Sequence, residues 1–369
     1  MRILLLSAYD ADSHIYWREG LVRNLPEHEW TVLSLPGRYF SWRMRGNSLS
    51  WAFGEAETLS KPYDLVIATS MTDLSSLRGF VPSLANTPTL VYFHENQFAY
   101  PSSGKEFKSV GPCILNLYTA LSADYCLFNS EYNRRTLLEG AEALLAKLPD
   151  HVPAGIVERI EERSCVLPVP LNEDSFLDHK GRRGEFHITW NHRWEFDKNP
   201  QLLLDSMIKL DQAGVDFTLH VVGQQFRKIP KQFEQLKTQL GSKIGHWGYM
   251  ESRSAYQALL QQSDVVLSTA LHDYQGIAVL EGAAAGAYPV VPDRLAYTEL
   301  FPIECRYESF DKNVNQVENE AVSLAATLQT LIKNKQAGVN LEKVDVSNLE
   351  WSELAESYRQ IITQIAAEK

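Results

Sequence analysis

The segment from residue 265 to residue 291 constrains the fold most, because its pattern is that of a strand, a helix and a second strand. Two apolar runs bound it, at residues 265–269 and 288–291, and each has the length and composition of a buried strand. A turn around Gly276 and a helical stretch rich in Gly and Ala separate them. Neighbouring parallel strands are joined by a crossover helix, so the segment predicts an α/β fold with a parallel sheet.

The start of this helix has the features of a diphosphate site. Gly276 allows a tight entry into the helix, which leaves the N–H groups of Ile277 and Ala278 facing a ligand. A helix N-terminus with free N–H groups and a favourable dipole suits a phosphate. Glu281 lies one turn further on, in position to accept hydrogen bonds from a ribose. The alternative is an ordinary strand–turn–helix unit in which Glu281 is merely solvated.

The rest of the chain repeats this alternation in two blocks. Buried strands are predicted at residues 3–8, 30–35, 64–70, 89–94 and 125–130 in the first block, and at 185–191, 217–223 and 244–250 in the second. Two domains are the natural expectation for 369 residues. We predict an N-terminal Rossmann-like domain over residues 1–175, a second over 185–345, and a C-terminal helix within 346–369 that returns to the first. The polar run 178–184 is the predicted linker, and residues 140–165 are predicted to be helical.

Polar side chains follow the predicted strands of the first block at their carboxyl ends. His14 and Asp73 follow two of the strands, and His94 and Asn96 follow a third. Parallel α/β sheets bind their ligands outside the carboxyl ends of the strands. His94 is therefore the candidate of this domain for the catalytic centre, and His14 and Asn96 are candidates for binding an acceptor. A histidine buried in the core is the alternative for His94.

The first loop of the second block carries two cations, Arg193 and Lys198. Asn199 and Pro200 follow them with the pattern of a helix cap and a first helical residue. This loop and the turn at Gly276 both end strands of one predicted sheet, so they can converge. Two cations facing a helix N-terminus would neutralise a leaving diphosphate. The alternative is a solvated loop whose cations pair with its own acids.

Asp273 and Glu281 are separated by seven residues and followed by a Gly/Ala-rich helix. This pattern resembles the E-x7-E element of retaining GT-B glycosyltransferases. The resemblance implies that Asp273 contacts the donor sugar, that Glu281 contacts the nucleotide ribose, and that Arg193 and Lys198 grip the diphosphate in place of a metal ion. Asp273 stands where Glu is usual, and this departure bears on the choice of donor.

Longer motifs are similar to those of the tRNA-queuosine mannosyltransferase family. They are YFHENQ at 92–97, WNHRWE at 190–195, DKNP at 197–200, HWGY at 246–249, the block from Ser268-Thr269-Ala270 to Phe301-Pro302, Ser13-His14, and the segment 36–45. The resemblance extends over nearly the whole chain as far as residue 305 or so. Ala11-Asp12 departs from it, because a Gly pair is expected there for a close backbone approach to donor or acceptor.

The resemblance implies a GT-B fold, in which two Rossmann-like domains have parallel sheets that face an inter-domain cleft. It also implies transfer of mannose from GDP-mannose to the cyclopentenediol of queuosine in a tRNA anticodon, with retention and with no cofactor beyond the nucleotide-sugar donor. His94 and Asp273 would then lie at the catalytic centre, and Tyr249 would border the nucleotide base.

Residues 37–45 bear on the acceptor. Arg38, Arg43 and Arg45 alternate there with aromatic residues. Unpaired bases stack on aromatic and guanidinium planes while cations meet the phosphates, so the stretch suits an anticodon loop. The formal net charge of the chain is -11, so an RNA partner requires such a local patch. The alternative is an amphipathic segment whose aromatic side chains pack into the first domain.

Composition adds further limits. No segment approaches the length of a transmembrane helix, and the first apolar run stops at Ser7, too early for a secretory signal. The four cysteines are scattered and form no C-x-x-C pair, which favours reduced thiols in the cytoplasm. The sequence does not specify an oligomeric state.

Three other functions stay open at this stage. A glycosyltransferase could act on a lipid or polysaccharide acceptor, and a non-catalytic module could bind a nucleotide sugar or RNA without turnover. A dinucleotide-dependent oxidoreductase is least favoured, because no G-x-G-x-x-G follows the first predicted strand.

Overall fold

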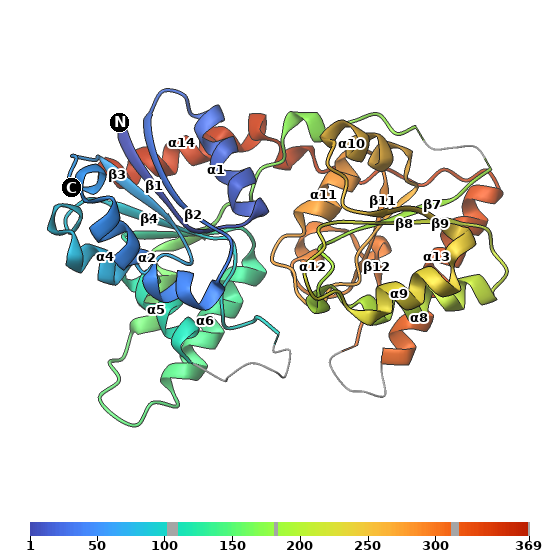
Figure 1. Cartoon of the computed structure of the whole chain (residues 1–369), viewed down its shortest axis with the longest axis horizontal. Helices are drawn as coiled ribbons and strands as arrows, with labels where there is room; N and C mark the ends of the chain where they lie inside the picture. The colour runs from blue at the N-terminus through green and yellow to red at the C-terminus, as the bar shows by residue number, and fades with distance from the viewer. Residues whose placement is uncertain (102–109, 181–183, 311–316, 368–369) are drawn as a thin grey trace. The chain divides into compact units, whose positions relative to one another are not determined.

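The structure is a computed structural model that describes residues 1–101, 110–180, 184–310 and 317–367 (Figure 1). The chain forms two compact units, each built around its own sheet. Unit 1 comprises Met1–Pro170 and Trp351–Lys369, and unit 2 comprises Leu171–Glu350. The predicted second domain began at residue 185, whereas unit 2 begins at Leu171.

The described part of unit 1 contains a six-stranded parallel sheet with the order β2-β1-β3-β4-β5-β6. Its strands are β1 (Arg2–Asp10), β2 (Glu29–Pro36), β3 (Leu65–Thr69), β4 (Thr89–Phe93), β5 (Tyr125–Phe128) and β6 (Ser164–Val166). Its helices are α1 (Asp12–Asn24), α2 (Phe40–Gly54), α3 (Ala56–Leu59), α4 (Leu74–Phe80), η1 (Pro82–Leu84), α5 (Gly111–Ser122), α6 (Glu131–Leu145), α7 (Ile156–Glu161) and α14 (Trp351–Ala367). Helices α1 and α14 cover one face of the sheet, and α2, α4 and α5 cover the other (Figure 1).

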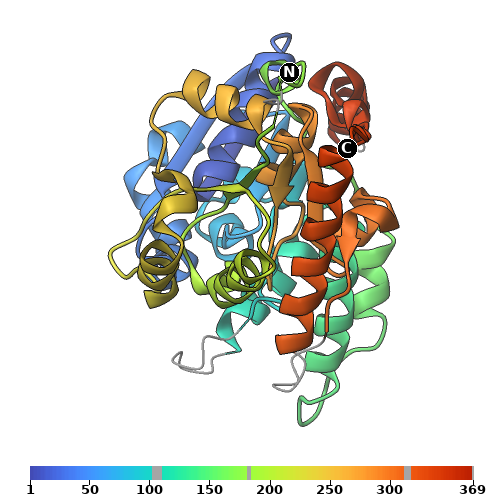
Figure 2. The ribbon, with the colours of Figure 1, turned by 90° about the vertical axis from the view of Figure 1, so that its right-hand side faces the viewer.

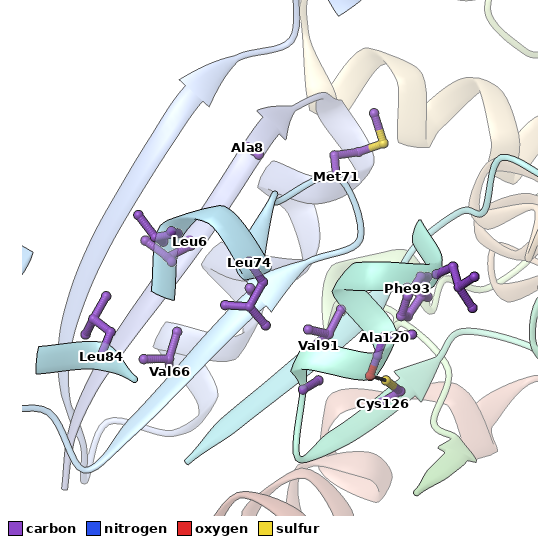
Figure 3. Close-up of a cluster of buried hydrophobic side chains, with 14 of the residues drawn as sticks. Leu6, Ala8, Val66, Met71, Leu74, Leu84, Val91, Phe93, Ala120 and Cys126 are labelled. Atoms are coloured by element: carbon purple, nitrogen blue, oxygen red, sulfur yellow. Dashed lines mark hydrogen bonds between the residues drawn. The ribbon is translucent and has the colours of Figure 1, made fainter. Parts of the chain in front are cut away.

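The core of unit 1 lies between the sheet and these helices (Figure 3). Every residue of β3 and β4 is buried, as expected for central parallel strands covered on both faces. Val66 of β3 and Val91 of β4 pack in one apolar cluster with Leu74 of α4 and Cys126 of β5. Cys126 thus fills space in the core, and all four cysteines are free thiols.

Helix α14 belongs to unit 1 although it closes the chain. The Trp17 indole of α1 donates a hydrogen bond to the Tyr358 hydroxyl at 3.1 Å, and the Pro168 carbonyl lies 2.9 Å from the same hydroxyl. Ile362, one turn further along, is fully buried. These contacts pack α14 against α1 and the sheet of unit 1.

The described part of unit 2 contains a second six-stranded parallel sheet, with the order β12-β11-β10-β7-β8-β9. Its strands are β7 (His187–Asn191), β8 (Thr218–Val222), β9 (Ile244–Gly248), β10 (Val265–Leu267), β11 (Tyr288–Pro292) and β12 (Arg306–Tyr307). Its helices are η2 (Glu173–Ser175), η3 (Phe196–Lys198), α8 (Pro200–Gln212), α9 (Lys231–Gln239), η4 (Gly241–Lys243), α10 (Arg253–Gln262), α11 (Ile277–Ala284), α12 (Tyr297–Leu300), η5 (Ile303–Cys305), α13 (Val317–Gln336) and η7 (Ser347–Leu349). The long orange-red helix α13 packs along α8 (Figure 2).

The predicted cap of α8 is confirmed. Asn199 is the N-cap, its side-chain oxygen accepts a hydrogen bond from the Leu202 N–H at 3.3 Å, and Pro200 is the first helical residue. This cap ends the loop after β7 at a defined place. The cap therefore fixes the backbone position of Lys198, the residue that precedes Asn199.

Two predictions about the middle of the chain were wrong. Residues 140–165 are not one helical stretch, because α6 ends at Leu145 and only the short helix α7 follows it. The run 178–184 is not the junction of the units, because the Leu177 and Lys180 N–H groups donate to carbonyls of unit 2. Residues 181–183 of that run lie outside the described residues.

Replacing Ile362 with Ala tests the attachment of α14. Removing a fully buried side chain leaves a cavity, so we expect the free energy of unfolding to fall by about 2–5 kcal/mol. Urea-induced unfolding followed by circular dichroism measures the change. Thr363→Ala is the matched control on an exposed neighbouring position and should leave stability nearly unchanged. Equal stability of the two variants would contradict the assignment of α14 to the core of unit 1.

Candidate functional site

Two loops of unit 2 begin side by side because β7 and β10 are neighbours in the sheet, with Trp190 paired to Leu267 at their carboxyl ends. The loop after β7 carries Lys198, and the loop after β10 leads to α11. Hydrogen bonds join the loops directly: the Thr269 hydroxyl donates to the Lys198 carbonyl at 2.7 Å, and another bond of 2.8 Å joins Leu271 N to the Asp197 carbonyl. The sheet order therefore produces the convergence that the sequence predicted.

The Lys198 ammonium lies at the start of α11. It donates to the His272 carbonyl at 2.7 Å and to Asp273 Oδ2 at 3.2 Å. Asp273 Oδ1 in turn accepts the Gly276 N–H at 3.0 Å, and Oδ2 accepts the Tyr297 hydroxyl at 3.0 Å. Lys198 is only 7% exposed, so the protein holds this cation in one place beside the helix start.

Arg193 shares a partner with Lys198. Its guanidinium lies 3.9 Å from Asp197 Oδ2, and the Lys198 ammonium lies 3.6 Å from the same oxygen. Arg193 also pairs with Glu195 at 3.0 Å and is half-exposed, whereas Asp197 is buried. The two predicted cations therefore gather at one place, with Lys198 rigidly held and Arg193 reaching the surface.

Burial and charge set the protonation of this cluster. Burial alone would raise the pKa of Asp273, but the Lys198 charge and hydrogen bonds from Lys198 and Tyr297 lower it to about 2. Burial and the Lys198 charge lower the pKa of His192 to about 3. At neutral pH, Asp273 is a carboxylate and His192 is an uncharged imidazole.

Gly276 is required by two geometric features. Its φ is +72°, a left-handed conformation that other residues adopt only with strain. A Cβ at this position would lie 2.7 Å from Cε1 of Tyr297. The first helical residues, Ile277 and Ala278, are half-buried, and an α-helix gives the N–H groups of its first turn no partner of its own.

Glu281 is not the solvated residue of the alternative interpretation. It is 7% exposed and accepts hydrogen bonds from Arg253 at 2.7 Å and from the Tyr256 hydroxyl at 3.2 Å. Burial raises the pKa of its carboxyl, and the Arg253 charge opposes that rise. Glu281 is therefore a placed carboxylate on the first turns of α11.

Tyr249 follows β9 and is 63% exposed. Strand β8 lies between β9 and β7, so Tyr249 follows a strand that is two positions in the sheet from β7, the strand before the Lys198 loop. Its contact with a nucleotide base stays a prediction.

In unit 1, His14 of α1 and His94, which directly follows β4, lie against each other. Their ring centroids are 4.2 Å apart, and the His94 ring also contacts Trp17 and Tyr92. Both histidines are nearly fully buried. Burial and the neighbouring His14 hold the pKa of His94 well below its usual value, so it is a neutral imidazole.

Asn96 lies in a different environment from the predicted one. It is fully buried, and its amide donates to Asn133 and to the Thr136 hydroxyl while accepting from the backbone of Phe98. Asn129 completes this network, because its amide donates to the His94 carbonyl at 2.9 Å. These asparagines hold the loop after β4, and we leave Asn96 out of the proposed acceptor site.

The aromatic side chains of residues 38–45 do not pack into the core. Tyr39 is 71% and Trp42 is 53% exposed. Arg38 and Arg45 are exposed as well, and the Arg38 guanidinium lies 5.7 Å from the centroid of the Tyr39 ring. Arg43 is half-buried and donates to a backbone carbonyl at 3.3 Å. The structure thus presents a basic and aromatic surface, which we call the α2 patch (residues 38–45).

Neither a metal cluster nor a membrane span is found in the described residues. Within 1–101, 110–180, 184–310 and 317–367, no group of three or more His, Cys, Asp or Glu side chains is arranged to hold a metal ion. Over the same ranges, no helix has the length and apolarity needed to cross a membrane.

Sequence reasoning did not identify four side chains of this region as site residues: Asp197, Arg253, Tyr256 and Tyr297. Arg253 and Tyr256 stand three residues apart on one face of α10, but neither residue was singled out from the sequence. Tyr297 lies inside the block that resembles the family, but its partner Asp273 is 24 residues away.

Comparisons with known proteins show the family to which the chain is similar. A family model described as tRNA-queuosine alpha-mannosyltransferase N-terminal matches residues 2–171, and one described as glycosyl transferases group 1 matches residues 178–342. A tRNA-queuosine alpha-mannosyltransferase of Drosophila melanogaster is 33% identical over 327 residues, covering 86% of this chain and 86% of that protein.

Solved structures show the same fold at low identity. A glycosyltransferase from Rickettsia africae superposes with a TM-score of 0.70 at 15% identity, over 100% of this chain and 99% of its own. A sucrose-phosphate synthase from Thermosynechococcus elongatus gives 0.69 at 14% identity, with 100% of both chains covered. Together with the group 1 match and the two parallel sheets, they confirm the predicted GT-B fold class.

The pKa of about 2 predicts how Asp273 contributes to stability. A lowered carboxyl pKa stabilises the fold fully above the unfolded value near 3.9, and this contribution is lost as the pH falls toward 2. The difference in unfolding free energy between the wild type and Asp273→Asn should therefore shrink by about 2 kcal/mol between about pH 5 and about pH 2. Urea unfolding at each pH measures it. The exposed Asp216→Asn serves as the control, and a difference that stays constant with pH for Asp273→Asn would contradict the ion pair.

Proposed function

The chain belongs to the tRNA-queuosine alpha-mannosyltransferase family, and from that premise we propose that it transfers mannose from GDP-mannose to queuosine in a tRNA anticodon, with retention. Its glycosyltransferase activity follows from the family and from the group 1 domain. The observation that carries the diphosphate-bound donor is the Lys198 ammonium fixed beside the start of α11, and the queuosine acceptor is inferred from the family. We expect the reaction in the cytoplasm, where tRNA is found.

The donor would bind to unit 2 by its diphosphate. Lys198 and Arg193 supply positive charge, and the N–H groups of Ile277 and Ala278 supply hydrogen-bond donors at the helix start. The ribose would lie further along α11, against the Glu281 carboxylate. Because the Lys198 and Arg193 side chains can neutralise the leaving diphosphate themselves, we propose no cofactor beyond the nucleotide sugar.

Asp273 would act at the sugar end. A carboxylate offers about four acceptor positions. Three are occupied, by Lys198, Tyr297 and the Gly276 N–H, so one remains for a sugar hydroxyl. Because Asp273 is ionised, it also keeps the Lys198 ammonium where the diphosphate charge develops.

The proposed reaction is a same-face displacement. The oxygen of a queuosine hydroxyl attacks the anomeric carbon as the bond from that carbon to the diphosphate breaks, and the hydroxyl proton passes to the departing GDP. Such a step needs placement and charge stabilisation more than a strong base. His94 fits this requirement, since a neutral imidazole can orient a hydroxyl by a hydrogen bond. His14 lies against His94 and would support the acceptor side.

The α2 patch would bind the tRNA. Its exposed aromatic side chains offer stacking surfaces, and Arg38 and Arg45 offer charges for phosphates. The alternative, in which these aromatic side chains pack into the first domain, does not fit Tyr39 or Trp42, which are 71% and 53% exposed. The patch supplies the local positive surface that an acidic chain needs to bind RNA.

Transfer of labelled mannose tests the proposal. Purified protein incubated with radiolabelled GDP-mannose should label queuosine-containing tRNA and leave unmodified tRNA unlabelled. The Lys198→Met variant should lose about 10²–10³-fold in rate, because it removes a fixed charge aimed at the leaving diphosphate. Nuclear magnetic resonance of the product nucleoside reads the anomeric configuration, and a β-mannoside would exclude retention.

Lys243→Met is the matched control for this variant. The Lys243 ammonium donates to a backbone carbonyl at 2.8 Å and pairs with Asp211 at 3.1 Å, much as Lys198 does with His272 and Asp273. Its loss should leave transfer unchanged. Labelling of a lipid or polysaccharide fraction in place of tRNA, or binding of GDP-mannose with no transfer to any acceptor, would refute the proposed function.

Replacing Arg38 and Arg45 together with Ala tests the α2 patch. We expect weaker tRNA binding and a plot of log K against log salt concentration whose slope is smaller by about 0.7 for each lost phosphate contact with a single strand. Filter binding over a range of salt concentrations measures both quantities. Arg135→Ala with Arg159→Ala removes two exposed arginines elsewhere in unit 1 and is the control. An unchanged slope in the Arg38 and Arg45 variant would remove the patch from the acceptor site.

A further inference from the structure

The Arg253 side chain joins the proposed ribose-binding acid to a second segment of unit 2. One guanidinium nitrogen donates to Glu281 Oε1 at 2.7 Å. The other donates to the Ser175 hydroxyl at 3.1 Å and lies 3.4 Å from Asp174 Oδ1, both in η2. Arg253 is the first residue of α10, whereas Glu281 lies in α11, so the hydrogen bond joins two helices.

Glu281 Oε2 is held separately. The Tyr256 hydroxyl donates to it at 3.2 Å and accepts a hydrogen bond from the Asn191 amide at 2.8 Å. The same Asn191 nitrogen lies 2.7 Å from the Ala278 carbonyl in the first turn of α11. Each oxygen of the Glu281 carboxylate thus has one fixed partner. Asn191, the last residue of β7, connects that strand to α11 through its bonds to Tyr256 and to the Ala278 carbonyl.

Counting acceptor positions shows what this arrangement leaves for a ligand. A carboxylate has about four such positions, and Arg253 and Tyr256 occupy one on each oxygen. One position remains on each oxygen, and the side chain keeps 9% of its surface exposed. Two adjacent acceptors match the two adjacent hydroxyls of a ribose, which are both donors. An unheld carboxylate would rotate freely and would present this pair only part of the time.

Resting on the nucleotide-sugar site proposed above, we propose that Arg253 is a positioning residue that holds Glu281 so that its two remaining acceptor positions receive the 2′ and 3′ hydroxyls of the donor ribose. Arg253 itself touches no ligand. It also compensates the charge of a carboxylate that is otherwise buried, which keeps that carboxylate an acceptor. Burial raises the pKa of Glu281 and Arg253 opposes the rise, so without Arg253 the carboxyl would take up a proton at a higher pH.

Calorimetric titration of the full chain with GDP and with 2′,3′-dideoxy-GDP tests the inference. The wild type should bind GDP about 10- to 100-fold more tightly than the dideoxy compound, the expected effect of hydrogen bonds to a charged group. Arg253→Met should bind GDP no more tightly than the wild type binds the dideoxy compound. The affinities of this variant for GDP and for the dideoxy compound should therefore be nearly equal. Affinity of the variant for GDP should recover as the pH is raised, whereas that of the wild type should not depend on pH in this way. Arg253→Lys should restore part of the preference for hydroxyls.

Arg306→Met is the matched control, because Arg306 makes an ion pair of 2.6 Å with Asp293 in the same unit. It should keep the full preference for ribose hydroxyls. If Arg253→Met does not fold, Tyr256→Phe removes only one hydroxyl from the arrangement and should weaken the preference by itself. A wild-type preference for GDP that persists in Arg253→Met, or in a folded Tyr256→Phe when the first variant fails to fold, would overturn the inference.

The outcome is separable from the proposed function. A chain that prefers the ribose hydroxyls through Arg253 yet transfers no mannose to tRNA would refute the function and leave the inference standing. If the wild type transfers mannose normally and Arg253→Met still prefers the ribose hydroxyls, the inference is overturned and the proposed function stands. Failure of the wild type to distinguish the two nucleotides would overturn the inference as well.

Discussion

The ion pair between Lys198 and Asp273 is the interaction on which the geometry of unit 2 depends. A buried ammonium loses its hydration, and only close partners offset that cost. Lys198 obtains them from the His272 carbonyl and the Asp273 carboxylate, both in the loop after β10. The loop after β7 must therefore lie against the loop after β10, next to the start of α11. A cation fixed in this way needs no rearrangement when negative charge develops on a leaving group, which is how a folded chain stabilises a transition state better than water does.

The two acids of unit 2 show how environment gives one functional group two roles. Asp273 receives a buried ammonium, a hydroxyl and a backbone N–H, and these outweigh burial and lower its pKa. Glu281 is paired with Arg253, whose side chain is 41% exposed, and burial prevails so that its pKa is raised. Asp273 is thus ionised at neutral pH and accepts hydrogen bonds from Lys198, Tyr297 and Gly276. Glu281 depends on its partner to stay ionised, which makes Arg253 the sensitive point of the proposed ribose site.

The sequence predicted the fold class and the convergence of two loops of unit 2, because both follow from local patterns. The alternation of strands and helices predicted two parallel sheets, and the loops after adjacent strands carried Arg193, Lys198 and Gly276 to one place. It failed where the decisive fact was a long-range partner. Asn96 has the polar character of a binding residue, but its partner Asn133 lies 37 residues away and buries it. Arg253 was not singled out at all, since its partner Glu281 lies 28 residues further along the chain.

A net charge of -11 does not oppose the proposed RNA acceptor once distances are considered. At physiological ionic strength the Debye length is about 8 Å, so an approaching phosphate responds mainly to the charges nearest to it. Arg38 and Arg45 are exposed on the α2 patch, and the exposed rings of Tyr39 and Trp42 stand among them. Bases that are already unpaired in an anticodon loop can stack there without the cost of opening a duplex. The net negative charge of the chain weakens non-specific RNA binding, so the proposed contact at the α2 patch would favour a loop that fits it.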